Sequence, residues 1–316
     1  MSAPPDDTDP KVCKRQKLDD VSVAAAATSV PLISLGHRAS DKLLLASVNE
    51  HPLDCRIVFV EEGHVYYVDG EALSLSVTGL IESVAGDHFD PDFVIGRMKR
   101  GKNWPNPAYS DILMSEDGKS GTDNSIMVPW SDERIKGVWA ANGKLAADLG
   151  TDLHSKIELY LNNVSIEFTD DVNRKEFSFF VNWWETKRDQ FEPYRTEWVI
   201  FDQDAKLAGS IDFVMRNKHS GKYYIVDWKR CKTSDSGFSC AYGKKFLPPL
   251  NHLQYHKSNK WGVQVNIYRL MLEKSYGIVI EGMCMVVFHE ENTKAKVFEY
   301  PFMDDVSVLL HQRYST

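Results

Sequence analysis

Three strand-like runs in the second half of the chain each carry one acidic residue, and this pattern constrains the fold more than any other feature. The runs cover residues 196–201, 207–215 and 223–228. Short polar segments separate them, which is typical of antiparallel hairpins. The acids Glu197, Asp212 and Asp227 follow one another at intervals of 15 residues. We therefore predict a three-stranded sheet that brings its acidic side chains together.

The symmetry of the two hairpins predicts where these carboxylates meet. If the turns are centred on Asp204–Ala205 and His219–Ser220, the three acids form one row across the strands. Directly opposed side chains have Cβ atoms about 4.5–5.5 Å apart, and like charges so placed destabilise a sheet. A divalent cation with oxygen ligands would relieve the repulsion. The alternative is that the acids are solvated, or that a bulge turns one to the other face; the apolar neighbours Ile211 and Val226 favour the metal site.

Lys229 lies two residues beyond Asp227, so the two side chains share one face of the strand. A lysine beside a bound metal can position or deprotonate a water molecule. The segment therefore offers a ligand carboxylate at Asp227, a main-chain carbonyl ligand at Trp228 and a catalytic amine at Lys229.

Composition divides the chain into three parts. Residues 1–40 are rich in Pro, Ala, Asp and Ser, and we expect a disordered tail. Residues 41–140 read as an N-terminal extension with a β-meander, helices and a flexible loop, and residues 141–316 read as the core domain.

The periodicity of apolar residues predicts the individual elements. In the extension we expect a β-meander over 56–77, helices over 78–84 and 91–99, and a loop over 102–130. In the second part we expect a helix over 131–162, with Asn142–Gly143 as a candidate break, and a helix over 174–188. The three strands follow, then a helix over 261–274 and strands over 278–288 and 297–302. This order predicts an α/β fold, more closely an α+β fold with a mixed sheet.

Bulk composition sets limits on location and cofactors. The net charge of −8 gives no whole-molecule argument for nucleic acid. The five cysteines are scattered, so we expect no iron–sulfur cluster.

The sequence also bears on the location of the protein. No apolar run approaches the roughly 20 residues of a membrane span, and the N-terminus lacks a secretory core. We therefore expect an intracellular, unsecreted protein without a membrane partner. The run Lys14–Lys17 fits either a nuclear-localisation patch or a solvated charged tail, and on its basis we favour a nuclear location.

Four segments resemble a known nuclease superfamily. Val226–Lys229 resembles the hydrophobic-D-x-K strand of PD-(D/E)XK nucleases, and Ala208–Asp212 resembles the G-x-x-D strand that precedes it. Gly150–His154 is similar to the G-x-x-x-H helix of the RecB-like branch, and Gln264–Tyr268 is similar to its Q-x-x-x-Y helix. Together they run from about 150 to 270 in the order of the family, and the set resembles the lambda-exonuclease-like proteins and the mitochondrial genome maintenance exonuclease group.

The resemblance implies a fold, a chemistry and roles for single residues. The fold is the restriction-endonuclease-like αβββαβ core, and the reaction is phosphodiester hydrolysis with Mg²⁺ or Mn²⁺. His154, Asp212 and Asp227 would be metal ligands, with Glu197 at a variable position of the family. Lys229 would be the catalytic lysine, and Gln264 and Tyr268 would contact the lysine or the substrate. Glu158, one turn after His154, is either a further ligand or an exposed charge, and we favour the exposed charge.

The segment that follows the catalytic lysine suits a nucleic acid substrate. Residues 229–260 hold seven Lys or Arg and one acid, interleaved with aromatic residues. Such a segment can contact phosphates and stack on bases, although a solvated loop has the same composition. We expect substrate contacts from Arg230, Lys232, Lys244 and Lys245. The smaller cluster of Lys99, Arg100 and Lys102 either contacts phosphate as well or forms the solvated end of a helix, and we favour the helix end.

These observations favour a metal-dependent DNA nuclease. We expect an exonuclease that acts on single-stranded or free ends, in DNA repair, recombination or replication, and we expect a monomer. One alternative is a catalytically silent nuclease fold that binds DNA; the presence of Asp212, Asp227 and Lys229 weighs against it. Another alternative is a nuclease that acts on RNA, because the chemistry does not distinguish the sugar.

Overall fold

The computed structural model describes residues 43–85, 89–114, 125–168, 170–232 and 244–314. The tail expected over residues 1–40, with its Lys14–Lys17 patch, lies outside the described residues. So does the middle of the basic segment after Lys229, residues 233–243.

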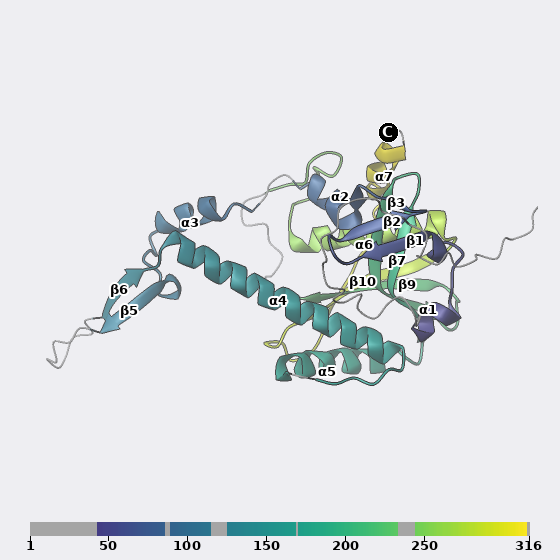
Figure 1. The fold of residues 1–316 in the computed structure, drawn as a ribbon, viewed down its shortest axis with the longest axis horizontal. Coiled ribbons are helices and arrows are strands. Elements are labelled where there is room, and N and C mark those ends of the chain that lie inside the picture. The colour runs from purple at the N-terminus through teal and green to yellow at the C-terminus, as the bar shows by residue number, and fades with distance from the viewer. Residues whose placement is uncertain (1–42, 86–88, 115–124, 169, 233–243, 315–316) are drawn as a thin grey trace, which may run out of the picture.

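A six-stranded mixed sheet forms the centre of the molecule (Figure 1). Its strands are β4 (Leu75–Ser76), β7 (Phe191–Asp202), β8 (Leu207–Asn217), β9 (Tyr223–Arg230), β10 (Ile280–Phe288) and β11 (Lys296–Glu299). β7, β8 and β9 are the three predicted acid-bearing strands, and they pair antiparallel, while β10 pairs parallel with β9 and β4 pairs parallel with β8. The predicted mixed sheet is therefore confirmed.

One edge of β8 is paired only at its two ends. β7 pairs along the whole of the opposite edge. On this edge β9 pairs with residues 213–216 and β4 pairs with residues 207–208. Among the described residues, 209–212 have no strand partner on that edge. β8 and β9 therefore separate where Asp212 lies. The backbone N–H and C=O groups along this opening are not used in strand pairing.

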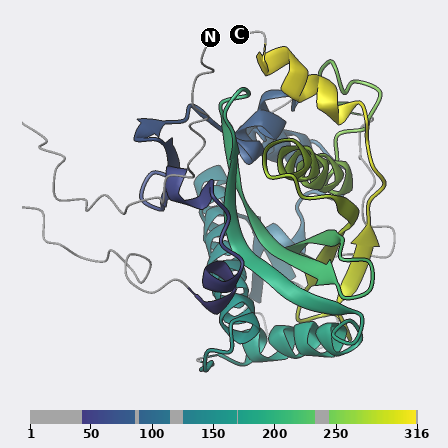
Figure 2. The same ribbon diagram turned by 90° about the vertical axis from the view of Figure 1, so that its right-hand side faces the viewer.

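Helices cover both faces of the sheet, which gives three layers (Figure 2). α4 (Asp132–Leu161) and α5 (Asp171–Glu185) pack on one face around Phe180, Phe213 and Trp228. α6 (Lys257–Ser275) and α7 (Val306–Tyr314) pack on the other, together with α2 (Val77–Ser83). The order α5–β7–β8–β9–α6–β10 is the predicted αβββαβ arrangement.

The N-terminal extension joins this core instead of standing apart. The short helix α1 (Leu44–Val48) precedes the meander strands β1 (Ile57–Val60), β2 (Val65–Val68) and β3 (Glu71–Ala72), which form the predicted antiparallel sheet. The meander packs through Tyr66 on Phe201 and Ala208 of the central sheet. A nearly buried ion pair between Arg195 on β7 and Asp54, 2.7 Å apart, fastens the same segment.

Residues 89–114 and 125–148, hereafter the arm, project from the body in Figure 1. They comprise α3 (Pro91–Lys99), the turn Pro107–Tyr109, the hairpin β5 (Ser110–Met114) and β6 (Ser125–Pro129), and the first half of α4. The prediction of a loop over 102–130 is therefore wrong in part, because its described residues contain a hairpin. Strand alternation could not reveal it, since Ile112, Leu113 and Ile126 are all exposed.

The helix expected over 131–162 is one continuous helix, so the expected break at Asn142–Gly143 is wrong. It runs across the boundary suggested at residue 140. The side chain of Ser131 accepts a hydrogen bond from the Arg134 N–H, 3.2 Å away, and starts the helix. No described helix is long and apolar enough to cross a membrane.

Candidate active site

Three side chains from three elements converge at the opening between β8 and β9. His154 comes from α4, Glu197 from β7 and Asp212 from β8. One nitrogen or oxygen atom from each lies within 4.8 Å of the others. His154 Nδ1 is 3.6 Å from Asp212 Oδ2 and 3.8 Å from Glu197 Oε1. The structure thus brings together three of the five groups that the sequence proposed as metal ligands.

The strand register that placed these acids together is confirmed. Thr196 pairs with Phe213 and Trp198 pairs with Ile211, so Glu197 lies level with Asp212. Glu197 has a φ of 42°, a left-handed conformation that is uncommon for residues other than glycine. Ser210 Oγ donates to Glu197 Oε2 at 3.4 Å.

Asp212 also closes the opening between the strands. The pair Phe213–Val226 sets a register in which Asp212 lies level with Asp227. The Trp228 N–H donates a hydrogen bond to Asp212 Oδ2 at a distance of 2.7 Å. In a regular antiparallel pair, a carbonyl of the neighbouring strand would be the acceptor. The Trp228 indole is buried and stacks on Phe213, with ring centroids 5.6 Å apart. Trp228 therefore fixes the orientation of the Asp212 carboxylate through its amide.

Asp227 is placed differently from the prediction, because its carboxylate is not part of the three-residue group. It forms an ion pair with Lys229, two residues along the same strand. The carboxylate is 1% exposed, and neither of its oxygens has a well-formed hydrogen bond from a described residue. A buried carboxylate with a single cationic neighbour has open coordination positions for a further positive partner.

The pKa values of the site show strong coupling between its charges. Burial opposes protonation of His154, but the carboxylates of Asp212 and Glu197 outweigh it and raise the imidazole pKa to about 9. Burial, and then the charge of Asp212, raise the pKa of Asp227 to about 6. Burial and the nearby Glu197 raise the pKa of Asp212, although His154 and Lys229 oppose the increase. The proton on the His154 imidazole thus offsets part of the negative charge of Glu197 and Asp212.

The amine of Lys229 is a stable cation in this setting. Burial disfavours its charge, but the carboxylates of Asp227 and Asp212 outweigh this and raise the pKa of Lys229 above its ordinary value. The side chain remains 26% exposed, so the ammonium group can reach a ligand in the opening.

Gln264 and Tyr268 lie one turn apart on α6, and Gln264 Nε2 donates to the Tyr268 hydroxyl at 3.2 Å. Burial, and next the charge of Asp227, raise the pKa of Tyr268 well above its usual value. A Cβ atom on Gly209 would lie 2.8 Å from the Tyr268 ring, so this position on β8 needs glycine. The motif residues of α6 therefore lie beside the carboxylates.

The predicted phosphate-binding residues have different surroundings. Arg230 Nε lies 2.8 Å from Glu176 Oε2 on α5, and both side chains are buried. Lys232 is exposed and pairs with Glu291 at 2.6 Å. Lys244 and Lys245 are exposed on the segment before α6. Arg230 thus joins β9 to α5, while the three lysines are open to solvent.

Some residues near the site gave no functional signal in the sequence. Ser210 lies inside the G-x-x-D segment but was given no role. Tyr66 is buried on β2, and burial followed by the charge of Glu197 raises its pKa to about 12. The expectation of an exposed charge at Glu158 is wrong, because this side chain is buried within α4.

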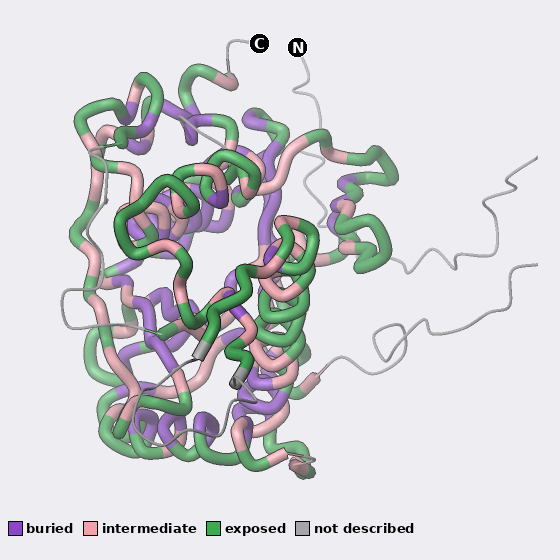
Figure 3. Tube along the Cα trace, turned by 90° about the vertical axis from the view of Figure 1, so that its left-hand side faces the viewer, coloured by how far each residue is buried: buried purple, intermediate pink, exposed green. Residues whose placement is uncertain are grey.

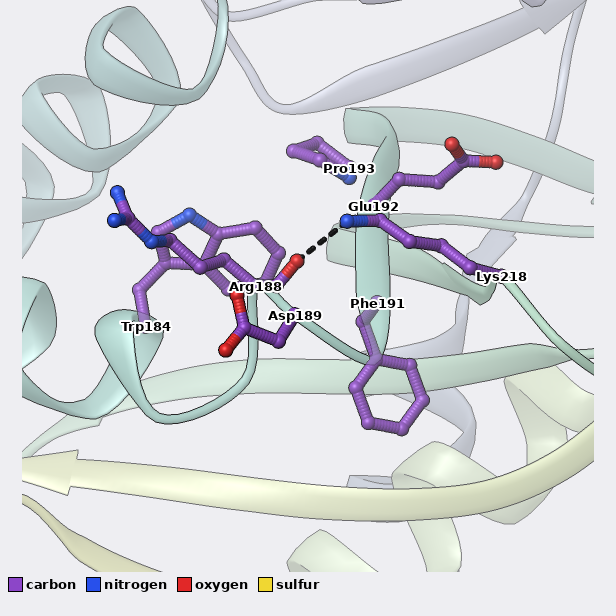
Figure 4. Close-up of a pocket in the computed structure, with 7 residues that line it drawn as sticks. All are labelled: Trp184, Arg188, Asp189, Phe191, Glu192, Pro193 and Lys218. Carbon is purple, nitrogen blue, oxygen red and sulfur yellow. Dashed lines mark hydrogen bonds between the residues drawn. The ribbon is translucent and has the colours of Figure 1, made fainter.

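A separate hollow of about 460 Å³ lies where α5 leads into β7 (Figure 4). Its lining includes Trp184, Arg188 and Lys218, whose ammonium donates to the Arg188 carbonyl at 2.6 Å. None of its lining residues belongs to the carboxylate cluster. The hollow therefore lies apart from the His154–Glu197–Asp212 group at the strand opening.

Comparison with known proteins finds one family model and several solved structures that match the chain. No curated protein matches the chain. A solved structure described as the crystal structure of SSO0001 is 16% identical, with a TM-score of 0.23, and the match covers 45% of this chain. The chain spans 59% of the length of that structure. Residues 151–301, which hold His154, both aspartates and Lys229, match the family model of the PD-(D/E)XK nuclease superfamily.

Proposed function

We propose that the chain is a Mg²⁺- or Mn²⁺-dependent exonuclease that hydrolyses DNA from single-stranded or free ends. The observation that carries this proposal is the His154–Glu197–Asp212 cluster beside the buried Asp227–Lys229 pair. The family match over residues 151–301 supports a nuclease in general. The restriction to DNA and to chain ends is the finer part of the proposal.

The donor set fits a hard divalent cation. Carboxylate oxygens suit Mg²⁺ and Mn²⁺, and an imidazole nitrogen shifts the preference toward Mn²⁺. His154, Glu197 and Asp212 are close enough to share an ion, and the buried oxygens of Asp227 lack other donors among the described residues. We include the Trp228 carbonyl in the proposed ligand set. A bound cation would polarise a phosphate and lower the pKa of a coordinated water.

The other residues of the site position the ligands and the lysine. Asp227 holds Lys229 at the opening, and the Trp228 amide holds Asp212. Lys229 is protonated in the metal-free site, so it enters as a cation that can orient a water or stabilise negative charge on phosphate. Tyr268, which accepts a hydrogen bond from Gln264, lies near enough to Asp227 and Asp212 for their charges to raise its pKa.

The choice of an exonuclease rests on resemblance. Gly150–His154 and Gln264–Tyr268 carry the patterns of the RecB-like, lambda-exonuclease-like branch, which is similar to the mitochondrial genome maintenance group. We therefore place the proposed activity in DNA repair, recombination or replication.

The test is cleavage of end-labelled single-stranded DNA, double-stranded DNA and RNA in Mg²⁺, Mn²⁺ or EDTA. We expect metal-dependent cleavage of DNA, with product lengths that shorten progressively from one end. Lys229→Met should lose at least about a hundredfold in cleavage rate, because a preorganised charge at the reacting phosphate is removed.

The other functions give different results. Cleavage restricted to RNA would replace the DNA proposal, and internal cleavage products would replace the exonuclease proposal. Tight binding of DNA without cleavage in either metal would identify a silent nuclease fold and refute the enzymatic proposal.

A further inference from the structure

The surface of the arm has an unusual combination of exposed aromatic and basic residues. Phe89 and Phe93 are 71% and 58% exposed. Phe93, Arg97 and Arg100 lie at positions i, i+4 and i+7 of α3, so they share one side of the helix. The guanidinium of Arg97 lies 6.0 Å from the centre of the Phe93 ring. An aromatic ring bordered by arginines offers a stacking face and phosphate contacts side by side.

The basic residues at the end of α3 are not all compensated within the molecule. Lys99 pairs with Asp132 of α4, and Lys136 of α4 pairs with Asp92. Arg100 and Lys102, in contrast, are exposed and form no ion pair with a described residue. Their charge is available to an acidic partner, in a protein whose net charge of −8 makes local basic surface uncommon.

The arm is connected to the candidate site by a single helix. The two ion pairs hold α3 on the first turns of α4, and His154 lies near the other end of the same helix. All residues from Ala140 to Asp148 are exposed, so this stretch of α4 bridges arm and body without packing on either (Figure 3). From Lys136 to His154 the helix rises about 27 Å, at about 1.5 Å per residue.

From these observations we propose that α3 binds single-stranded nucleic acid at a distance from the site of cleavage. Phe93 stacks on a base, and Arg100 and Lys102 contact the phosphates of a strand whose end lies at the His154 cluster. At about 3.4 Å per stacked nucleotide, the distance corresponds to about eight nucleotides. This inference deepens the proposed nuclease function and rests on it for the identity of the substrate.

The test measures binding separately from cleavage. The dissociation constant of a fluorescent single strand of about 30 nucleotides, well above a typical binding-site length, is determined by anisotropy in an Asp227→Ala background. The triple variant Phe93→Ala, Arg100→Glu, Lys102→Glu is compared with Lys222→Glu, an exposed charge reversal at the β8–β9 turn. We expect the triple variant to weaken binding by at least about tenfold, because one lost stack alone accounts for that. Lys222→Glu should change it little.

A length series locates the contact. In the otherwise wild-type enzyme, the triple variant should raise KM for the long strand and leave kcat unchanged. A trinucleotide is too short to reach α3, so its cleavage should be the same in both proteins. Equal loss on both substrates, or an unchanged dissociation constant for the long strand, overturns the proposal.

Two further results separate this proposal from its competitors. If wild type binds the long strand but cleaves no substrate, the nuclease proposal fails, while the binding comparison still decides the role of α3. The exposed apolar hairpin β5–β6 makes a second copy of the chain the main competing partner of the arm. If the triple variant abolishes self-association in size-exclusion chromatography and leaves DNA binding intact, the arm is a protein interface and the proposal is wrong.

Discussion

At the scale of single residues, the site is a balance of buried charges. Two aspartates, a glutamate, a histidine and a lysine meet at one strand opening. In the metal-free protein, protonated His154 and Lys229 supply the positive charge. A bound divalent cation would replace the positive charge of protonated His154, because an imidazole that binds a metal must be neutral.

Asp227→Asn should show this balance through the pH dependence of stability. Burial and Asp212 raise the pKa of Asp227 to about 6, above the roughly 3.9 of an unfolded chain. The stabilising contribution of Asp227 is therefore fully present below about pH 4 and is lost as pH rises through 6. In EDTA, the Tm of Asp227→Asn relative to wild type should rise between pH 5 and pH 7. A difference in Tm that stays constant with pH would contradict the raised pKa.

The residues of the site were predictable because their positions follow from hairpin symmetry. The register places Glu197, Asp212 and Asp227 at one level, as their spacing predicts. The direction of each carboxylate was not predictable. It depends on the separation of β8 from β9 and on the Lys229 ammonium, which pairs with the Asp227 carboxylate outside the His154–Glu197–Asp212 group. Tyr66 approaches through tertiary packing of a distant meander, for which local sequence carries no signal.

At the scale of elements, buried ion pairs determine how the helices sit on the sheet. Glu176 on α5 and Arg230 on β9 are 0% and 8% exposed, and Arg230 directly follows Lys229, the proposed catalytic lysine. Without Glu176, the described acidic partner left to the buried Arg230 is the half-exposed Glu290, 3.8 Å away, which compensates the charge only weakly.

Glu176→Ala should therefore lower the free energy of unfolding by about 3–5 kcal/mol. Glu185→Ala is the matched control on the same helix, because Glu185 pairs with Arg188 in an exposed position and should contribute at most about 1 kcal/mol. Urea denaturation measures both. Similar small changes for the two variants would show that the buried pair does not hold α5 on the sheet.

The continuity of α4 gives a second prediction at this scale. Gly143 is exposed on the bridging stretch, and a Cβ atom there would meet nothing within 4 Å. Gly143→Ala should strengthen the helix by about 1 kcal/mol, and Gly143→Pro should break it at a cost of about 3 kcal/mol. Hydrogen exchange of the amides between 140 and 148 reports both changes. Faster exchange in Gly143→Ala would indicate that the helix is interrupted at Asn142–Gly143 after all.

The elements differ in how well the sequence predicts them. The core strands β8 and β9 are buried on both faces and α6 is buried on most of its circumference, so their runs of apolar residues are visible in the sequence. The hairpin β5–β6 and the bridging stretch of α4 pack on little, and their apolar and polar residues carry no period to detect. The helix-breaking signal at Asn142–Gly143 is local, and the surrounding turns of α4 override it.

At the scale of the whole molecule, the first part of the N-terminal extension, residues 43–85, packs on the central sheet. β4 extends the central sheet beside the opening at β8, and Val77 and Leu80 of α2 are buried in the same core as α6. Tyr66 brings the meander up to Glu197. Composition alone separates residues 41–140 from the rest, but the packing does not.

A fragment of residues 141–316 should therefore fail to fold as a domain. Its core would expose the surfaces that α2, β4 and the meander cover, and nearly the whole arm, including α3, would be missing. We expect no cooperative thermal transition and no near-ultraviolet circular dichroism signal in the fragment, whereas residues 43–316 should show both. A fragment that unfolds cooperatively and cleaves DNA would show that the extension is dispensable.

The central claim is that the carboxylate cluster at the β8–β9 opening is a metal-dependent nuclease centre. The most direct measurement is the single-turnover cleavage rate of end-labelled DNA in Mg²⁺ by wild type, Asp212→Asn and Asp204→Asn. Asp204 is an exposed acid at the β7–β8 turn, so it controls for the same chemical change outside the cluster. We predict that Asp204→Asn cleaves like wild type and that Asp212→Asn is slower by at least about a hundredfold, with EDTA abolishing the activity of all three. Equal rates for the two variants, or cleavage that persists in EDTA, would contradict the account.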